Sequence, residues 1–189
     1  MPRPKLTCTT SASAGASFNS KWKDILLIRH LVLSLAAAGL CASAAHAKPI
    51  VRHTNPPPAI ILGGVTIPPG AEVLMLSGQL ASPIDPAKTE GIEAYGDTKT
   101  QTISTFKKIE AALAKQGYAM SDVVKLTVFV VGDPKLGGKM DFAGFNAGYR
   151  EFFGTAANPN LVARSTVQVA GLAGPQFLIE IEATAAKAP

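Results

Sequence analysis

Four side chains that could take part in catalysis or ligand binding lie in two C-terminal segments. The alternation of apolar and polar residues in these segments predicts β-strands. Arg164 and Thr166 belong to the first segment, and Glu180 and Glu182 belong to the second. Arginine and glutamate rarely lie within a sheet without a partner or a task. A strand face that carries a cation, a hydroxyl and two carboxylates is either a polar site or a solvated face with ordinary cross-strand ion pairs.

The relative placement of these side chains depends on how the two segments pair. A glycine-rich connection joins them, and an antiparallel hairpin about this connection places Thr166 opposite Glu180 and Arg164 opposite Glu182. Because side chains of a strand alternate with period two, all four then point to one side of the sheet. This hairpin is the arrangement that we expect from the sequence.

The elements that position these side chains are predicted from periodicity and from turn residues. The arm at 48–62 contains three consecutive prolines, which favour an extended conformation. Asp97 or Thr98 can cap the start of a helix whose apolar residues recur at three- and four-residue steps. The predicted helices span 97–116 and 142–153, the predicted strands span 65–67, 73–76, 123–131, 163–169 and 177–185, and a loop spans 133–140.

The order of these elements, β-β-α-β-α-β-β, predicts an α+β fold with two helices packed on one face of a mixed β-sheet. The domain built from them spans 63–189. The alternation in the strands also places apolar residues on the face that the helices leave open. We therefore expect self-association to cover that face.

The first 47 residues differ in composition from the rest of the chain. The chain has 18 basic and 13 acidic residues, and residues 1–47 hold five of the basic residues and one of the acidic ones. A basic stretch, an apolar run at 31–40 and an Ala-x-Ala sequence ending at Ala47 predict a cleaved signal peptide and a periplasmic or secreted protein. A retained membrane anchor is an alternative, whereas a lipoprotein is disfavoured because Leu40 precedes Cys41.

Cleavage after Ala47 leaves about 142 residues with no cysteine, no tryptophan and a single histidine, His53. This composition excludes a cysteine nucleophile, a Cys/His zinc site and any Ser-His-Asp triad that avoids His53. The glycine pairs lack the strand and helix context of a phosphate loop, and the charges of the domain are mixed in sign. We therefore expect no Cys/His zinc site, no phosphate-binding loop and no nucleic-acid partner, and no stable membrane association after cleavage.

Five sequence blocks, taken together, resemble the RidA (YjgF) family, and the resemblance covers roughly 65–185. The blocks occur in the family's order and at near-family spacing. They are Ser77-Gly78-Gln79, then 122–130, then Asp141-Phe142 with Asn146 and Tyr149 through Phe153, then 163–167, and finally 179–183.

The resemblance implies a chorismate-mutase-like fold and a homotrimer with clefts at the subunit interfaces. It also implies hydrolysis of 2-imino or enamine acids to 2-oxo acids and ammonia, without metal or cofactor. By this resemblance Arg164 binds the substrate carboxylate and Glu180 positions the water molecule. The segment around Thr166 contacts the substrate nitrogen, and Ser77 and Asn146 line the cleft.

Three positions depart from the family pattern. The family has a cleft tyrosine at the position of Gly64 and a proline at the position of Val162. Its loop at 132–140 is shorter than the loop of this chain. These departures leave a second function open, which is a non-catalytic trimeric binding protein for small carboxylate metabolites. A third is the ribonuclease or chaperone-like role that is sometimes attached to the family.

Overall fold

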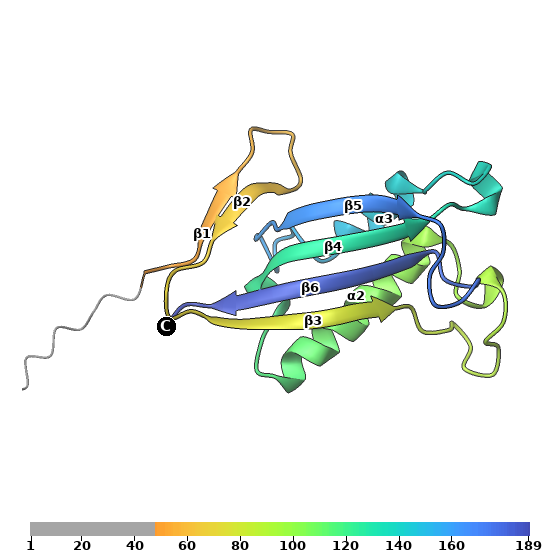
Figure 1. The fold of residues 1–189 in the computed structure, drawn as a ribbon, viewed down its shortest axis with the longest axis horizontal. Coiled ribbons are helices and arrows are strands. Elements are labelled where there is room, and N and C mark those ends of the chain that lie inside the picture. Colours follow the sequence, from red (N-terminus) through yellow and green to blue (C-terminus); the bar gives the residue numbers. More distant parts are fainter. Residues whose placement is uncertain (1–47) are drawn as a thin grey trace, which may run out of the picture. The chain divides into compact units, whose positions relative to one another are not determined.

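The computed structural model describes residues 48–189, and the predicted signal peptide at 1–47 lies outside the described residues. Six strands and two α-helices make up the domain (Figure 1). None of the helices within 48–189 is long and apolar enough to cross a membrane. The strands are β1 Val51–Thr54, β2 Leu62–Thr66, β3 Glu72–Leu80, β4 Val123–Val131, β5 Ala163–Val169 and β6 Ile179–Lys187, and the helices are α2 Thr98–Lys115 and α3 Phe142–Tyr149.

The strands form one mixed sheet in the order β1-β2-β5-β4-β6-β3, and both α-helices lie against the same face (Figure 1). Strand β5 is parallel to β4 and to β2, and the other neighbouring pairs are antiparallel. The α+β fold with two helices on one face is therefore confirmed. The predicted strands 123–131 and 163–169 match β4 and β5, whereas β3 and β6 extend beyond or are shifted from their predicted ranges.

The expected hairpin between the two C-terminal strands is wrong. Strand β4 lies between β5 and β6, so neither Arg164 with Glu182 nor Thr166 with Glu180 forms a cross-strand pair. The physical reason is that β4, α3 and β5 form a crossover unit, in which the returning strand lies parallel to the first and beside it. The other edge of β4 is then free to pair with β6.

Helix α2 is well specified by local sequence. The Asp97 side chain caps its start by accepting a hydrogen bond of 2.8 Å from the backbone N–H of Thr100. Its apolar stripe packs on the sheet, and Phe106, Ile109 and Leu113 are fully buried. The prediction of this helix is therefore confirmed.

Helix α3 is shorter than predicted, since it ends at Tyr149 and not at residue 153. Residues after it continue as turns, and the side-chain amide of Asn158 donates 2.8 Å to the carbonyl oxygen of Phe152. This bond satisfies a carbonyl group with a side chain in place of a further helical turn. Phe153 is nevertheless buried against Phe106, at a centroid distance of 5.5 Å.

An arginine adds to the pairing of β2 with β5 in attaching the N-terminal hairpin of β1 and β2 to the rest of the sheet. The guanidinium of Arg52 donates to the carbonyl oxygens of Ser121, Val123 and Leu161 at 2.8, 2.9 and 2.8 Å. Burial lowers the pKa of Arg52, and Asp122 opposes this effect. The sequence predicted only an extended arm here, and the arm contains a paired strand.

The face of the sheet that the helices leave open carries apolar side chains in contact with solvent. Val73, Met75 and Val167 are 41%, 77% and 46% exposed. The helix-free face therefore exposes apolar side chains, as the alternation in the strands predicted.

Candidate functional site

Arg164 is held on the helix-covered side of the sheet, between β5 and α3. Its Nη2 donates a hydrogen bond of 2.9 Å to Oδ1 of Asn146. The guanidinium carbon lies 5.7 Å from the ring centroid of Phe142 and 4.7 Å from those of Phe145 and Tyr149. Aromatic faces attract a cation at these distances, so α3 fixes the guanidinium with one amide and three rings.

The other terminal nitrogen of Arg164 is buried and has no hydrogen-bond partner within residues 48–189. The hydroxyl of Thr166, which lies two residues along on the same face of β5, is also buried and has no hydrogen-bond partner within these residues. Burial lowers the pKa of Arg164, and the nearby Tyr149 opposes this effect. Since a guanidinium keeps its charge in proteins, Arg164 presents an unsatisfied cationic donor that a carboxylate would satisfy.

Local sequence explains the position of α3 beside Arg164. The side chain of Asp141 caps the helix by accepting 2.8 Å from the backbone N–H of Gly144. At the other end, the hydroxyl of Tyr149 donates 3.0 Å to the carbonyl oxygen of Ile60. Burial raises the pKa of Tyr149, so its hydroxyl remains a donor at neutral pH.

Glu180 lies on the opposite side of the sheet. It pairs with Phe129 of β4 and Leu80 of β3, next to an irregularity of β3 between Leu76 and Gln79. A Cβ atom at Gly78 would come within 1.8 Å of a carboxylate oxygen of Glu180. The missing side chain of Gly78 therefore makes the room in which this carboxylate lies.

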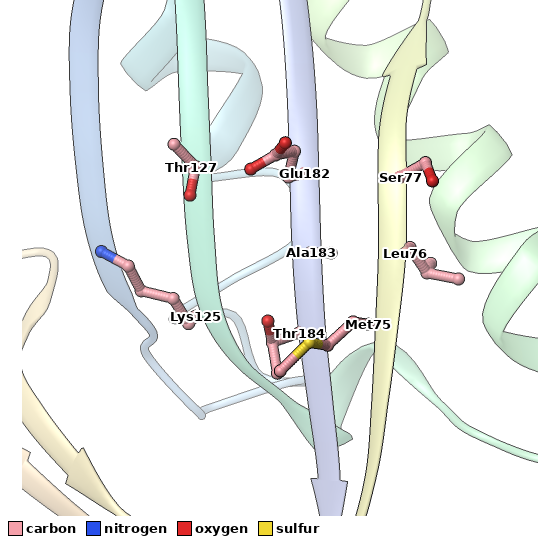
Figure 2. A pocket seen from close by; sticks show the side chains of 8 residues that line it. All are labelled: Met75, Leu76, Ser77, Lys125, Thr127, Glu182, Ala183 and Thr184. Atoms are coloured by element: carbon pink, nitrogen blue, oxygen red, sulfur yellow. The ribbon is translucent and has the colours of Figure 1, made fainter.

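Ser77 borders a hollow of about 270 Å³ on the helix-free face, shown in Figure 2. Within it, the side chain of Glu182 is directed toward Thr127, whereas that of Ser77 is directed away from β6. Lys125 reaches across to donate 2.8 Å from Nζ to Oγ of Ser165. The complete lining is Met75, Leu76, Ser77, Lys125, Thr127, Glu182, Ala183 and Thr184.

The structure thus divides the expected site residues into two groups. Arg164, Asn146 and Thr166 lie together on the helix side, whereas Glu180 and Ser77 belong to the β3–β6 edge. Arg164 pairs with Leu126 of β4, three residues before the partner of Glu180. At about 3.3 Å per residue and about 4.8 Å between strands, the Cα atoms of Arg164 and Glu180 lie roughly 14 Å apart, and their side chains point to opposite faces.

The aromatic surroundings of Arg164 were missed from the sequence. Phe142, Phe145 and Tyr149 follow one another at steps of three and four, which places them on one helix face. The strand itself gave no such signal, because its polar residues Arg164, Thr166 and Gln168 alternate with Val167 and Val169 in the sequence, whereas the structure exposes Ser165 and Val167. The spacing of the three rings on the helix was therefore the signal that indicated an aromatic face. No group of three His, Cys, Asp or Glu side chains within 48–189 is placed to hold a metal ion.

Comparisons with known proteins give a consistent result. The family model Endoribonuclease L-PSP matches residues 64–187. A RutC family protein of Haemophilus influenzae is 36% identical over 138 residues, which cover 72% of this chain and 96% of that protein. A 2-iminobutanoate/2-iminopropanoate deaminase of Salmonella typhimurium is 36% identical over 115 residues, which cover 61% of this chain and 80% of that enzyme. The solved structure of the Rid family protein YyfB of Yersinia pestis is 26% identical, with a TM-score of 0.54, and the match covers 71% of this chain and 96% of that chain.

Proposed function

Because the chain belongs to the RidA/YjgF/RutC family, whose family model is Endoribonuclease L-PSP, we propose that it hydrolyses 2-imino or enamine acids to 2-oxo acids and ammonia. The relative in Salmonella typhimurium named a 2-iminobutanoate/2-iminopropanoate deaminase supports this reaction class. The observation that carries the proposal is the buried, unsatisfied nitrogen of Arg164.

Arg164 supplies the recognition step. A 2-imino acid carries its carboxylate on the carbon next to the imine, and a guanidinium binds a carboxylate through charge-assisted hydrogen bonds. Nη1 of Arg164 is free to donate, while Asn146 keeps Nη2 in place. The substrate is thereby held by its acid group, with the imine carbon beside Thr166.

Glu180 supplies the hydrolytic step. Its carboxylate orients a water molecule and accepts a proton as the water oxygen adds to the imine carbon. The C=N bond becomes a single bond, and the nitrogen takes up the proton that Glu180 has accepted. In the resulting 2-amino-2-hydroxy acid, the proton of the hydroxyl is passed through Glu180 to the amino nitrogen, the C–N bond breaks, and ammonia and a 2-oxo acid leave.

These two steps require a second copy of the chain. Arg164 and Glu180 lie on opposite faces of one sheet, whereas the carboxylate and imine carbons of the substrate are bonded to each other. We place the cleft between Arg164, Asn146 and Thr166 of one subunit and Glu180 and Ser77 of the next. A homotrimer gives three such clefts and covers the exposed apolar residues of the helix-free face.

In the test of this proposal, the imine substrate is generated within the assay mixture. An L-amino-acid oxidase produces 2-imino acids in the presence of semicarbazide, which traps whatever imine remains. We expect the purified protein to lower the rate of semicarbazone formation, because it hydrolyses the imine before the trap reacts, and Arg164→Ala to abolish most of this effect. Rates equal to spontaneous hydrolysis across several amino acids would reject the deaminase proposal.

A non-catalytic binding protein for small carboxylates is the second candidate. Gly64 supports it, because the nearest atom to a Cβ built there, in the ring of His53, is 4.0 Å away, and no aromatic hydroxyl fills this position. This protein would bind 2-oxo acids through Arg164 without turnover. Calorimetry with 2-oxobutanoate, run beside the semicarbazone assay, separates the two candidates.

A further inference from the structure

Gln168 ties the end of β5 to the loop that follows β4. It lies on the same face of β5 as Arg164 and Thr166, since these residues alternate along the strand. Its Nε2 donates 2.8 Å to the carbonyl oxygen of Gly138, and its Oε1 accepts 3.0 Å from the backbone N–H of Met140. One side-chain amide therefore satisfies two backbone groups of the loop.

The loop at 132–140 is itself closed by backbone bonds. The N–H of Asp133 donates 2.9 Å to the carbonyl oxygen of Lys139, and that of Gly138 donates 3.0 Å to the carbonyl oxygen of Asp133. A Cβ atom at Gly132 would lie 2.1 Å from the carbonyl oxygen of Gly138, so the two ends of the loop are in backbone contact. Asp133 is only 7% exposed. The loop is thus one folded unit whose place on the sheet is set by Gln168.

This loop leads directly into the helix that holds Arg164. Met140 precedes Asp141, the cap of α3, and α3 is only eight residues long. Within it, Phe142 stacks on the guanidinium and Asn146 accepts from it. The bond from Met140 to Gln168 therefore sets where α3 begins relative to the strand that carries Arg164.

We infer that Gln168 is a positioning residue for carboxylate recognition: it holds the 132–140 loop so that α3 keeps Arg164 in its anion-binding orientation. The inference rests on the proposed role of Arg164. An amide is suited to the task because it has both a donor and an acceptor. Glutamate would still accept from Met140, but it would place a carboxylate against the carbonyl oxygen of Gly138.

The experiment compares Gln168→Met and Gln168→Glu with Gln116→Met, a matched control at the exposed end of α2. Calorimetry measures the Kd for 2-oxobutanoate, and the imine assay measures KM and kcat. We expect Gln168→Met to raise Kd and KM about tenfold with kcat within about twofold, Gln168→Glu to lie between, and Gln116→Met to match the wild type.

Each outcome decides the matter. A lower melting temperature of Gln168→Met with unchanged Kd and KM would show a purely structural bond and overturn the inference. If the wild type binds 2-oxobutanoate but does not hydrolyse imines, the deaminase proposal is rejected. The role of Gln168 is then decided by the Kd values of the wild type and of Gln168→Met. A wild type that neither binds 2-oxobutanoate nor hydrolyses imines would overturn both.

Discussion

A site divided between two faces of one sheet can be restored by mixing two inactive variants. Arg164→Ala removes the carboxylate-binding half of the proposed cleft, and Glu180→Gln removes the water-positioning half. If the two halves come from different subunits, a trimer that contains both variants has one cleft in which an intact Arg164 meets an intact Glu180. In a cyclic trimer, about one of the three clefts is then intact, whether the trimer holds two copies of Arg164→Ala and one of Glu180→Gln or the reverse.

The structure sets the size of the signal. The buried nitrogen of Arg164 has no alternative partner within 48–189, so its charge-assisted bonds to a carboxylate are worth roughly 1.5–3 kcal/mol, or about ten- to over a hundredfold in kcat/KM. Loss of a positioned base at Glu180 costs about 10²–10⁴-fold. A mixed trimer at about one third of the wild-type rate therefore stands well above either parent variant.

The assay is imine hydrolysis by trimers that carry differently tagged copies of the two variants, purified through both tags in sequence. The control is Arg164→Ala carrying both tags, which has no intact cleft in any arrangement. Mixed trimers of the correct mass that stay at the level of the control would refute the division of the site between subunits. Light scattering that gives a monomer mass for the wild type would refute it as well.

Three further expectations follow from single contacts and from the N-terminal pattern. Gly78→Ala should displace the carboxylate of Glu180 and lower kcat at least about tenfold, with Gly171→Ala, in open space, as the unaffected control. Asp97→Ala should lower the free energy of unfolding by about 1 kcal/mol. Because the hydrogen bond from the helix N–H lowers the pKa of Asp97, this loss of stability is fully present above a pH of about 3.9 and disappears as the pH falls through the lower pKa of the folded state. Urea titrations of the variant and the wild type at pH 7 and pH 3 would show the difference. The chain should be cleaved after Ala47 on export, and a periplasmic protein with the full-length mass would contradict this expectation.

Elements with strong local signals could be predicted from the sequence. Helix α2 combines a capping aspartate, a continuous apolar stripe and a terminal glycine, and its bounds agree with the prediction to within one residue at each end. Strand β4 is a run of β-branched residues between turn residues and matches its predicted range. In both cases the information lies within the element. Helix α3 ends at Tyr149, and the segment after it is held by Asn158, nine residues beyond the helix, through a bond to the carbonyl oxygen of Phe152 that local periodicity does not reveal.

Strand neighbours could not be predicted in the same way. Alternation assigns a side chain to one of two faces, and it does so for Arg164 and Glu180 separately, but it does not say whether the two faces are the same. That depends on which strand lies between β5 and β6, and hence on the crossover through α3. The hairpin failed for this reason: two segments that are adjacent in sequence are separated by β4 in the sheet. The resemblance could therefore name candidate site residues, but the sequence could not give their placement in the sheet.

This separation gives the two candidate functions different requirements. Arg164, its amide partner Asn146 and the three rings of α3 all belong to one chain, so an isolated subunit already contains what is needed to hold a carboxylate. Glu180 cannot reach that carboxylate from the far side of the same sheet, so the proposed hydrolysis needs a neighbour. In the proposed function, recognition is therefore a property of the β5–α3 unit, in which we infer that Gln168 is a positioning residue, and turnover is a property of the proposed trimer. A binding protein could therefore become a deaminase through the packing of its helix-free face, with no change around Arg164.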